Sequence, residues 1–492
     1  MSGQGSDEVT SPLEDDDLLS EILLRLPTLP SSLPRASLVC KRWQRLATDA
    51  IFLRLFRGRH LKPPMLGAFS KASVAGEIVF TPLLDPPDRI PTERFSLRVC
   101  GEDAPDVCHV FGSHHGHVLV INWRTLELAV FDPVSGDRRT IVIPPECGDS
   151  GLIIDNGTVL CLCAARNYQG HVHGDCHSRP LKVVLVGRDK TVHPQAAFAR
   201  VYSSETGMWG DIISSAEPCT GALSRHPCTF IGSALYWRLI GGGDGILEFD
   251  LDNQSLTVID WPTDDPVLTN SCTIRGEDGG VGVALLLYPN LEMWDRKVNH
   301  RGVATWVLRK TTDMTGMLGP ESANAYIVGY DEDADAVFML ILIDGDPCSP
   351  FLIIVQLESM KVKEYYGSSI AENYYYSFRS FHTAGTPHSD VVQGARDAAP
   401  MPQLQKAGAG GVQRPVLTGD AQATNSLLVV NDNVEAGRGE ARRRRRWGWG
   451  WTCHYRKTAR CQVLTCKPNV KTRVLSLHQP KPSTDWRKHG KK

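Results

Sequence analysis

Two kinds of hydrophobic pattern divide this chain. From residue 12 to residue 60 the apolar positions follow helical spacing, whereas from 65 to 385 they form short runs separated by polar turns. In the second part, Leu247, Phe249 and Leu251 alternate with acidic residues, a period of two that is typical of strands with one buried face. The pattern therefore predicts a small helical domain followed by a large β domain.

The helical part begins with a clear apolar stripe. Its members recur at positions that share one face of a helix: Leu18, Leu19, Ile22, Leu23 and Leu26. Acidic residues 14–17 precede the stripe, where negative charge stabilises a helix start, and Pro27 ends it. Further short helices are expected through 33–39, 43–47 and 52–56. A segment of about fifty residues is small for an independent core, so we expect a partner to share the burial.

The segments Leu18-Leu-Ser-Glu-Ile-Leu-Leu-Arg-Leu-Pro27 and Leu33-Pro-Arg-Ala-Ser-Leu-Val-Cys-Lys-Arg-Trp43 closely resemble the F-box motif. One feature departs from the family, which usually has Leu-Pro before the acidic residues where this chain has Leu13-Glu14. The resemblance implies that residues 12–60 bind the linker subunit of an SCF-type ubiquitin ligase and, through it, a cullin. By motif position, the linker-binding candidates are Leu18, Leu19, Ile22, Leu23, Leu26, Pro27, Val39, Cys40 and Trp43. Some of them must instead form the domain's own core, and for Ile22 and Trp43 both roles stay open.

The β part contains a weak internal repeat. A strand leads into a polar turn near five anchors, at steps of about fifty residues or more: Asp132, Ser203, Asp250, Val307 and Gln356. Such a period is typical of kelch-like blades, so we expect a β-propeller of about six or seven blades over 65–385, with a pair of β-sandwiches as the fallback. This region resembles the F-box-associated region of plant, grass-type F-box proteins, which implies that it holds a target protein for ubiquitination.

One cluster of metal-binding residue types lies within the β part. Its members are Cys161, Cys163, His171, His173, Cys176 and His177. A tetrahedral zinc site commonly uses Cys-x2-Cys or His-x3-His pairs, and neither spacing occurs here. We therefore expect a buried strand and a polar loop rather than a metal site.

Two other clusters also have a structural explanation. Asp331, Asp333 and Asp335 begin like a calcium loop but lack its glycine and its twelfth-position glutamate, so they predict the acidic turn of a hairpin between 327–328 and 337–338. His114, His115 and His117 flank Gly116 and resemble the turn before a blade strand of the F-box-associated family, here a strand over 118–121. The sequence contains no known catalytic motif. We expect no catalytic residue and no cofactor, and the F-box resemblance implies a non-catalytic adaptor.

Charge is divided unevenly along the chain. The formal net charge is only −2, yet residues 438–492 contain 17 Lys and Arg against two acidic residues. The tail over 386–492 is of low complexity, and we expect it and residues 1–11 to be disordered. Within it, five consecutive arginines are candidates for a nuclear-localisation signal, and the alternative is a disordered extension without such a role: Arg442, Arg443, Arg444, Arg445 and Arg446. Arginine and tryptophan both stack on bases, so a nuclear nucleic-acid-associated protein is the alternative function.

The ends and the cysteines bear on location. The first residues have neither a basic nor an apolar signal region, and the longest apolar run, residues 336–343, is too short to span a bilayer. The 14 cysteines are scattered, which predicts reduced thiols. We therefore expect a cytoplasmic or nuclear protein without a membrane partner.

Overall fold

The computed structural model describes most of the chain up to residue 382. The described residues are 13, 15–71, 77–97, 107–149, 151–162, 176, 179–192, 195–241, 245–262, 270–318, 323–343, 350–366 and 374–382. The expectations for residues 1–11 and for the tail over 386–492, including Arg442–Arg446, lie outside them. No helix in these ranges has the length and apolar character needed to cross a membrane.

Four helices form the N-terminal helical domain. They are α1 (Asp16–Leu23), α2 (Ser32–Ser37), α3 (Lys41–Thr48) and α4 (Ala50–His60). Asp15 caps α1 by accepting the backbone N–H groups of Asp17 and Leu18, and Asp49 caps α4 in the same way. The helices pack around a small apolar core: Leu19, Leu23, Leu24, Leu33, Ala36, Phe52 and Phe56.

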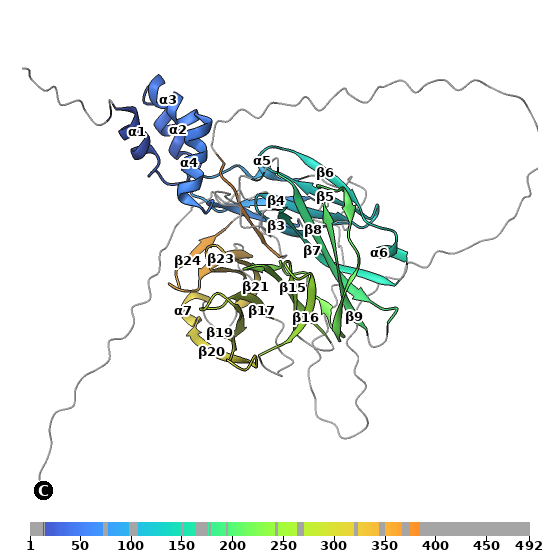
Figure 1. The fold of residues 1–492 in the computed structure, drawn as a ribbon. Coiled ribbons are helices and arrows are strands. Elements are labelled where there is room, and N and C mark those ends of the chain that lie inside the picture. Colours follow the sequence, from blue (N-terminus) through green and yellow to red (C-terminus); the bar gives the residue numbers. More distant parts are fainter. Residues whose placement is uncertain are drawn as a thin grey trace, which may run out of the picture. The chain divides into compact units, whose positions relative to one another are not determined.

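After the helical domain, the strands of the described chain form six antiparallel sheets, here called blades 1 to 6 (Figure 1). Blade 1 contains β1 (Met65–Lys71), β2 (Ile78–Pro82) and β25 (Tyr376–Arg379). Blade 2 contains β3 (Cys108–His114), β4 (His117–Asn122), β5 (Glu127–Phe131) and β6 (Arg138–Val142). Blade 3 contains β7 (Leu152–Cys161), β8 (Leu181–Asp189), β9 (Ala196–Ser203), β10 (Met208–Trp209) and β11 (Ile213–Pro218).

The other three blades follow in chain order, and the colours of Figure 1 run around the sheets in the same order. Blade 4 contains β12 (Ala222–Leu223), β13 (Thr229–Ile231), β14 (Ala234–Ile240), β15 (Gly245–Asp250) and β16 (Ser255–Asp260). Blade 5 contains β17 (Ser271–Arg275), β18 (Val281–Leu287), β19 (Asn290–Val298) and β20 (Ala304–Asp313). Blade 6 contains β21 (Ala323–Asp331), β22 (Ala336–Ile343), β23 (Phe351–Gln356) and β24 (Val362–Tyr365). Three short helices connect strands: α5 (Thr92–Phe95), α6 (Glu146–Asp149) and α7 (Thr315–Leu318).

Two observations show that the ring of blades is closed. The last strand, β25, pairs with β1, so both ends of the β part share blade 1. In addition, six apolar clusters each join two neighbouring blades, and the cluster containing Phe338 and Tyr375 joins blade 6 to blade 1. The fold is therefore a six-bladed β-propeller, which confirms the predicted propeller, fixes the blade count at six and excludes the β-sandwich fallback.

The turn between the third and fourth strands of a blade explains the sequence repeat. The Asp132 and Asp250 carboxylates each accept two backbone N–H groups of the turn that follows, at distances between 2.8 and 3.2 Å. A residue with positive φ completes the turn, as at Gly136 (φ 81°) and Gly207 (φ 70°). Four of the five anchors lie at the end of a third strand or directly after it.

The prediction that Val307 marks the fifth of these turns is wrong. Val307 lies inside β20, the fourth strand of blade 5, and the equivalent turn is at Asn299, whose side-chain oxygen accepts the N–H groups of Arg301 and Val303 at 2.9 and 3.0 Å. The apolar run around Val307 has the appearance of an inner strand, but Val307 and Leu308 are exposed. Periodicity alone does not distinguish an apolar inner strand from an apolar outer one.

Candidate functional site

The N-terminal helical domain divides the nine linker-binding candidates. Leu19 and Leu23 are buried in its core, so they are among the candidates that form the domain's own core. Leu26 and Trp43 are half-buried against that core. The candidates that remain exposed are Leu18, Ile22, Pro27, Val39 and Cys40.

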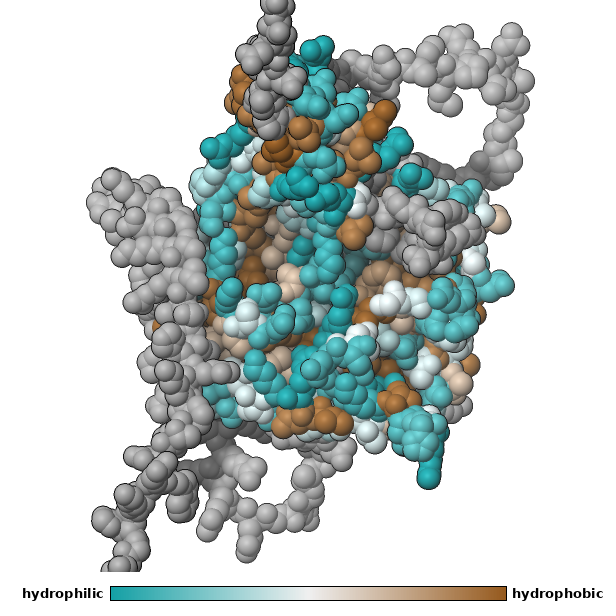
Figure 2. Space-filling model, turned by 60° about the vertical axis from the view of Figure 1, so that its left-hand side comes forward, coloured by the Kyte–Doolittle hydropathy of each residue, from teal (hydrophilic) through white to brown (hydrophobic). Residues whose placement is uncertain are grey.

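The exposed candidates are accompanied by apolar residues that the motif did not single out. Leu38 is 83% exposed beside Val39, and Ile51 and Leu55 are exposed on α4. Ile51 and Leu55 are four residues apart, and so are the buried Phe52 and Phe56 beside them. This helical spacing places each pair on one face of α4, so the sequence contains the pattern of a second apolar face next to the buried one. Brown side chains at the surface of the upper part of Figure 2 show the same retention of apolar groups on the domain. Single exposed apolar residues are ordinary, but several on one small domain are typical of a protein-binding surface.

The propeller offers a different kind of surface at each end of its inner strands. Strands β3 and β25 are both inner strands and pack side by side. His109 and Tyr376, early in these strands, line one pocket, whereas Ser113 and Arg379, late in them, line another. We call these the strand-start pocket, of about 210 Å³, and the strand-end pocket, of about 220 Å³.

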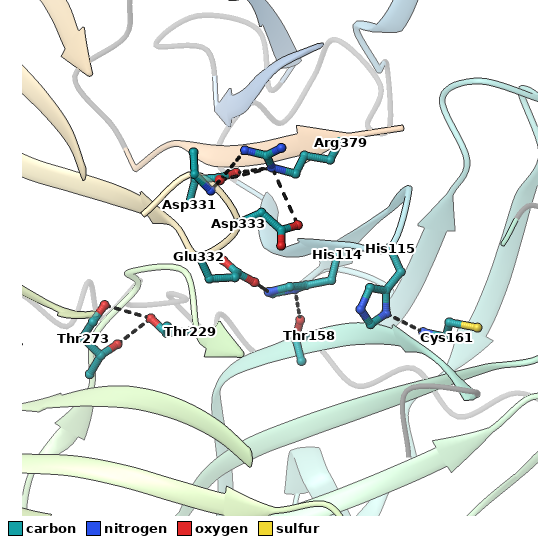
Figure 3. A network of polar contacts seen from close by, with 11 residues as sticks. His114, His115, Thr158, Cys161, Thr229, Thr273, Asp331, Glu332, Asp333 and Arg379 are labelled. Atoms are coloured by element: carbon teal, nitrogen blue, oxygen red, sulfur yellow. Dashed lines mark hydrogen bonds and ion pairs between the residues drawn. The ribbon is translucent and has the colours of Figure 1, made fainter. Parts of the chain in front are cut away.

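The strand-end pocket is dominated by an ion pair between blades 6 and 1 (Figure 3). Arg379 donates from Nη2 to Asp331 Oδ1 at 2.6 Å and from Nε to Oδ2 at 2.8 Å, and its Nη1 donates to the Pro63 carbonyl at 2.9 Å. Burial alone would raise the pKa of Asp331, but the charge and hydrogen bonds of Arg379 hold that pKa below its ordinary value. The pair therefore binds the closing strand β25 to the end of β21.

The acid stability of the propeller should depend on this carboxylate. A lowered pKa in the folded state stabilises the fold above the ordinary value of 3.8, and the stabilisation is lost as the pH falls through the folded value. We expect the free energy of unfolding to fall below about pH 4, and to fall less steeply in an Asp331→Asn/Arg379→Met variant. Urea unfolding monitored by fluorescence at several pH values measures both slopes, and equal slopes would contradict the prediction.

Two histidines at the same end connect blades 2, 3 and 6. His114 Nε2 lies 3.1 Å from Glu332 Oε1, and its Nδ1 lies 2.9 Å from Thr158 Oγ1 (Figure 3). The Cys161 N–H donates to His115 Nδ1 at 3.1 Å, which leaves the proton of a neutral His115 on Nε2. These contacts pair polar groups with one another, as expected of side chains that hold the inner strands together.

The strand pairing confirms the turns predicted for the acidic cluster and for the histidines. The hairpin between β21 and β22 confirms the acidic turn, because Asp331 is paired with Arg379 and Asp335 accepts the Tyr330 hydroxyl at 2.8 Å. His114 and His115 do form the predicted turn, and they also line a pocket that no local sequence pattern indicates. The charged residues that line it with them, Asp331 and Arg379 among them, are more than 200 residues away in the chain.

The metal and thiol expectations rest on few described residues. Of the six candidate ligands, Cys163, His171, His173 and His177 lie outside the described residues. Cys108 and Cys161 each take part in a disulfide, so the expectation of reduced thiols is wrong at these two positions. Disulfide pairing depends on which side chains the fold brings together, and the spacing of cysteines along the chain does not show this. Among the described residues no group of three or more His, Cys, Asp or Glu is arranged to hold a metal ion.

The strand-start pocket combines aromatic walls with basic side chains. Its walls include Phe111 and Trp123, whose rings lie perpendicular with centroids 5.8 Å apart, together with Tyr374 and Tyr376. Lys71, His109 and Arg225 also line it. Asp155, the one carboxylate among the described residues of its lining, is neutralised by Arg188, which donates to its two oxygens at 2.6 and 2.9 Å. These residues come from blades 1 to 4, so no local sequence pattern indicates the pocket.

Comparison with known proteins identifies the helical domain. Residues 15–55 match the F-box domain family. The chain is also similar to an F-box protein of Arabidopsis thaliana, with 24% identity over 311 residues that cover 61% of this chain and 79% of that protein. The chain thus contains N-terminal F-box helices followed by a six-bladed propeller.

Solved structures similar to this chain have low TM-scores. A fungal lectin from Aleuria aurantia, itself a six-bladed β-propeller, has a TM-score of 0.31 at 14% identity, and covers 65% of this chain and all of that one. A Bacteroides caccae protein of unknown function has a TM-score of 0.32 at 8% identity, and covers 59% of this chain and 90% of that one. The assignment of the fold rests on the strand pairing described above.

Proposed function

We propose that this chain is the target-recognition subunit of an SCF-type ubiquitin ligase. F-box domains generally bind the linker subunit of such complexes and, through it, a cullin. In this proposal the propeller holds a target protein near the ubiquitin-conjugating enzyme, and the chain acts by proximity rather than by chemistry of its own. The F-box match over residues 15–55 is the observation that carries the proposal.

The exposed apolar residues of the F-box domain support a protein partner there. Leu18 and Ile22 lie one turn apart on α1 and remain exposed, although Leu19 and Leu23 of the same stripe are buried. Val39, at the turn before α3, is 61% exposed. The apolar stripe of α1 is thus wider than the part that the domain's core covers. The exposed apolar area that is left would be buried favourably against a partner protein.

The experiment is a binding assay between the full chain and the purified linker subunit. A Leu18→Asp/Ile22→Asp variant places two charges on the exposed part of the stripe, and we expect at least a tenfold loss of affinity because an interface would have to bury them. Val192→Asp is the matched control, since Val192 has a similar exposed fraction in a turn of the propeller. Binding of the double variant at wild-type affinity would exclude this face of α1 as the interface, and a folded wild-type chain that does not bind would overturn the proposal.

A further inference from the structure

Among the described residues that line the strand-start pocket, Arg225 supplies an exposed and unpaired positive charge. Lys71 and His109 also line the pocket, but each already has an interaction of its own. Asp155, the one carboxylate among the described lining residues, is neutralised by two hydrogen bonds from Arg188. A ligand that enters this pocket therefore meets the unpaired guanidinium of Arg225.

The loop that carries Arg225 is held at three consecutive carbonyl groups. Asn156 Nδ2 donates to the carbonyls of Ser224 and His226 at 2.8 and 3.1 Å, and the Tyr376 hydroxyl donates to the carbonyl of Arg225 at 3.0 Å. Both donor residues are buried. A backbone fixed in this way positions the arginine before any ligand arrives, so less entropy is lost on binding.

The guanidinium of Arg225 is available to bind a ligand. Within the described part of the chain it has no hydrogen bond or ion pair, in contrast to Arg188 and Arg379, which are both paired with aspartates. A planar guanidinium binds carboxylate and phosphate groups through two parallel hydrogen bonds. A fixed backbone beneath a free arginine is the arrangement expected of an anion-recognition site.

We propose that the strand-start pocket binds an anionic side chain of the target protein, a carboxylate or a phosphate, through Arg225. The aromatic rings of Trp123 and Tyr374 line the same pocket and would contact the chain next to the anionic residue. This inference rests on the proposed function, because it assigns the target to one end of the propeller. It makes the charge of one target residue a determinant of recognition.

The test uses the purified full chain and four pools of fluorescent degenerate nonapeptides that differ only at the central position. That position is phosphoserine, glutamate, serine or lysine, and binding is measured by fluorescence polarisation. We expect the phosphoserine or the glutamate pool to bind, and Arg225→Gln to weaken that binding at least tenfold. Arg301→Gln is the matched control, because Arg301 is also exposed and lies in the turn after β19.

The pools distinguish the two sources of negative charge. Stronger binding of phosphoserine than of glutamate assigns the pocket to phosphate, and equal binding assigns it to a carboxylate. The inference is overturned if no pool binds better than the serine pool, if lysine binds best, or if Arg225→Gln binds like wild type. Linker binding by Arg225→Gln is measured in parallel: retained linker binding with lost peptide discrimination limits a failure to this pocket, whereas failed linker binding by wild type would count against the proposed function.

Discussion

Arg379→Met is expected to lower the free energy of unfolding of the propeller by about 3–5 kcal/mol. The substitution leaves Asp331, whose side chain is 2% exposed, without its cationic partner. A buried carboxylate without a counter-charge must either stay charged at a high cost or take up a proton. The damage falls where β21 meets the closing strand, two segments that are also joined by the Tyr375 N–H, which donates to the Val328 carbonyl at 2.8 Å.

Urea unfolding monitored by tryptophan fluorescence measures this effect, and the same two blades provide its control. Lys363 on β24 pairs with Asp85 after β2 at 2.9 Å, but the two side chains are 34% and 49% exposed. Lys363→Met should therefore cost only about 0–1 kcal/mol. Asp331→Asn/Arg379→Met removes both charges and should recover part of the loss. If Arg379→Met were as stable as Lys363→Met, the buried pair would contribute no more to closure than a surface pair.

The propeller could be predicted from the sequence because the same local turn recurs in several blades. Asp132 and Asp250 begin turns with the same carboxylate contacts, and such turns are set by a few consecutive residues. The closure of the ring was not readable, because β25 pairs with β1 across nearly the whole length of the β part. The count of six follows from the six sheets, and the assignment of β25 to blade 1 follows from that one long-range pairing.

The two pockets could not be predicted from the sequence, because they too depend on contacts between residues far apart in the chain. His114 and Glu332, or Asp331 and Arg379, meet only because the inner strands of different blades lie side by side. A single sequence shows neither the order of the blades nor which end of a strand faces a pocket. The histidines were therefore interpreted as a turn, which they form, and their contacts across blades were missed.

The F-box stripe shows a limit of a different kind. Helical spacing correctly places Leu18, Leu19, Ile22 and Leu23 on one side of α1, but it does not say where the core ends and the surface begins. That boundary depends on how α2 and α4 pack against α1. The structure places it between adjacent residues, since Ile22 is 39% exposed and Leu23 is 1% exposed.

Leu23→Asp is therefore expected to unfold the F-box domain, whereas Ile22→Asp leaves it folded. A charge at position 23 would enter the core beside Leu19 and Phe56, at a cost of several kcal/mol that a domain of this size cannot absorb. At position 22 the same charge stays in contact with water. Limited proteolysis followed by mass spectrometry measures the difference: cleavage within residues 15–60 should become rapid in Leu23→Asp alone, while the propeller of both variants stays resistant.

The same pair of variants decides what a loss of linker binding means. Leu23→Asp would abolish binding by unfolding the domain, so its loss carries no information about the interface. Ile22→Asp changes the neighbouring residue on the exposed side, and a loss of binding with an unchanged proteolysis pattern locates the contact on α1. Rapid cleavage of Ile22→Asp would instead mean that Ile22 belongs to the core in solution, and the exposed stripe would then have to be reduced to Leu18 and the residues around Val39.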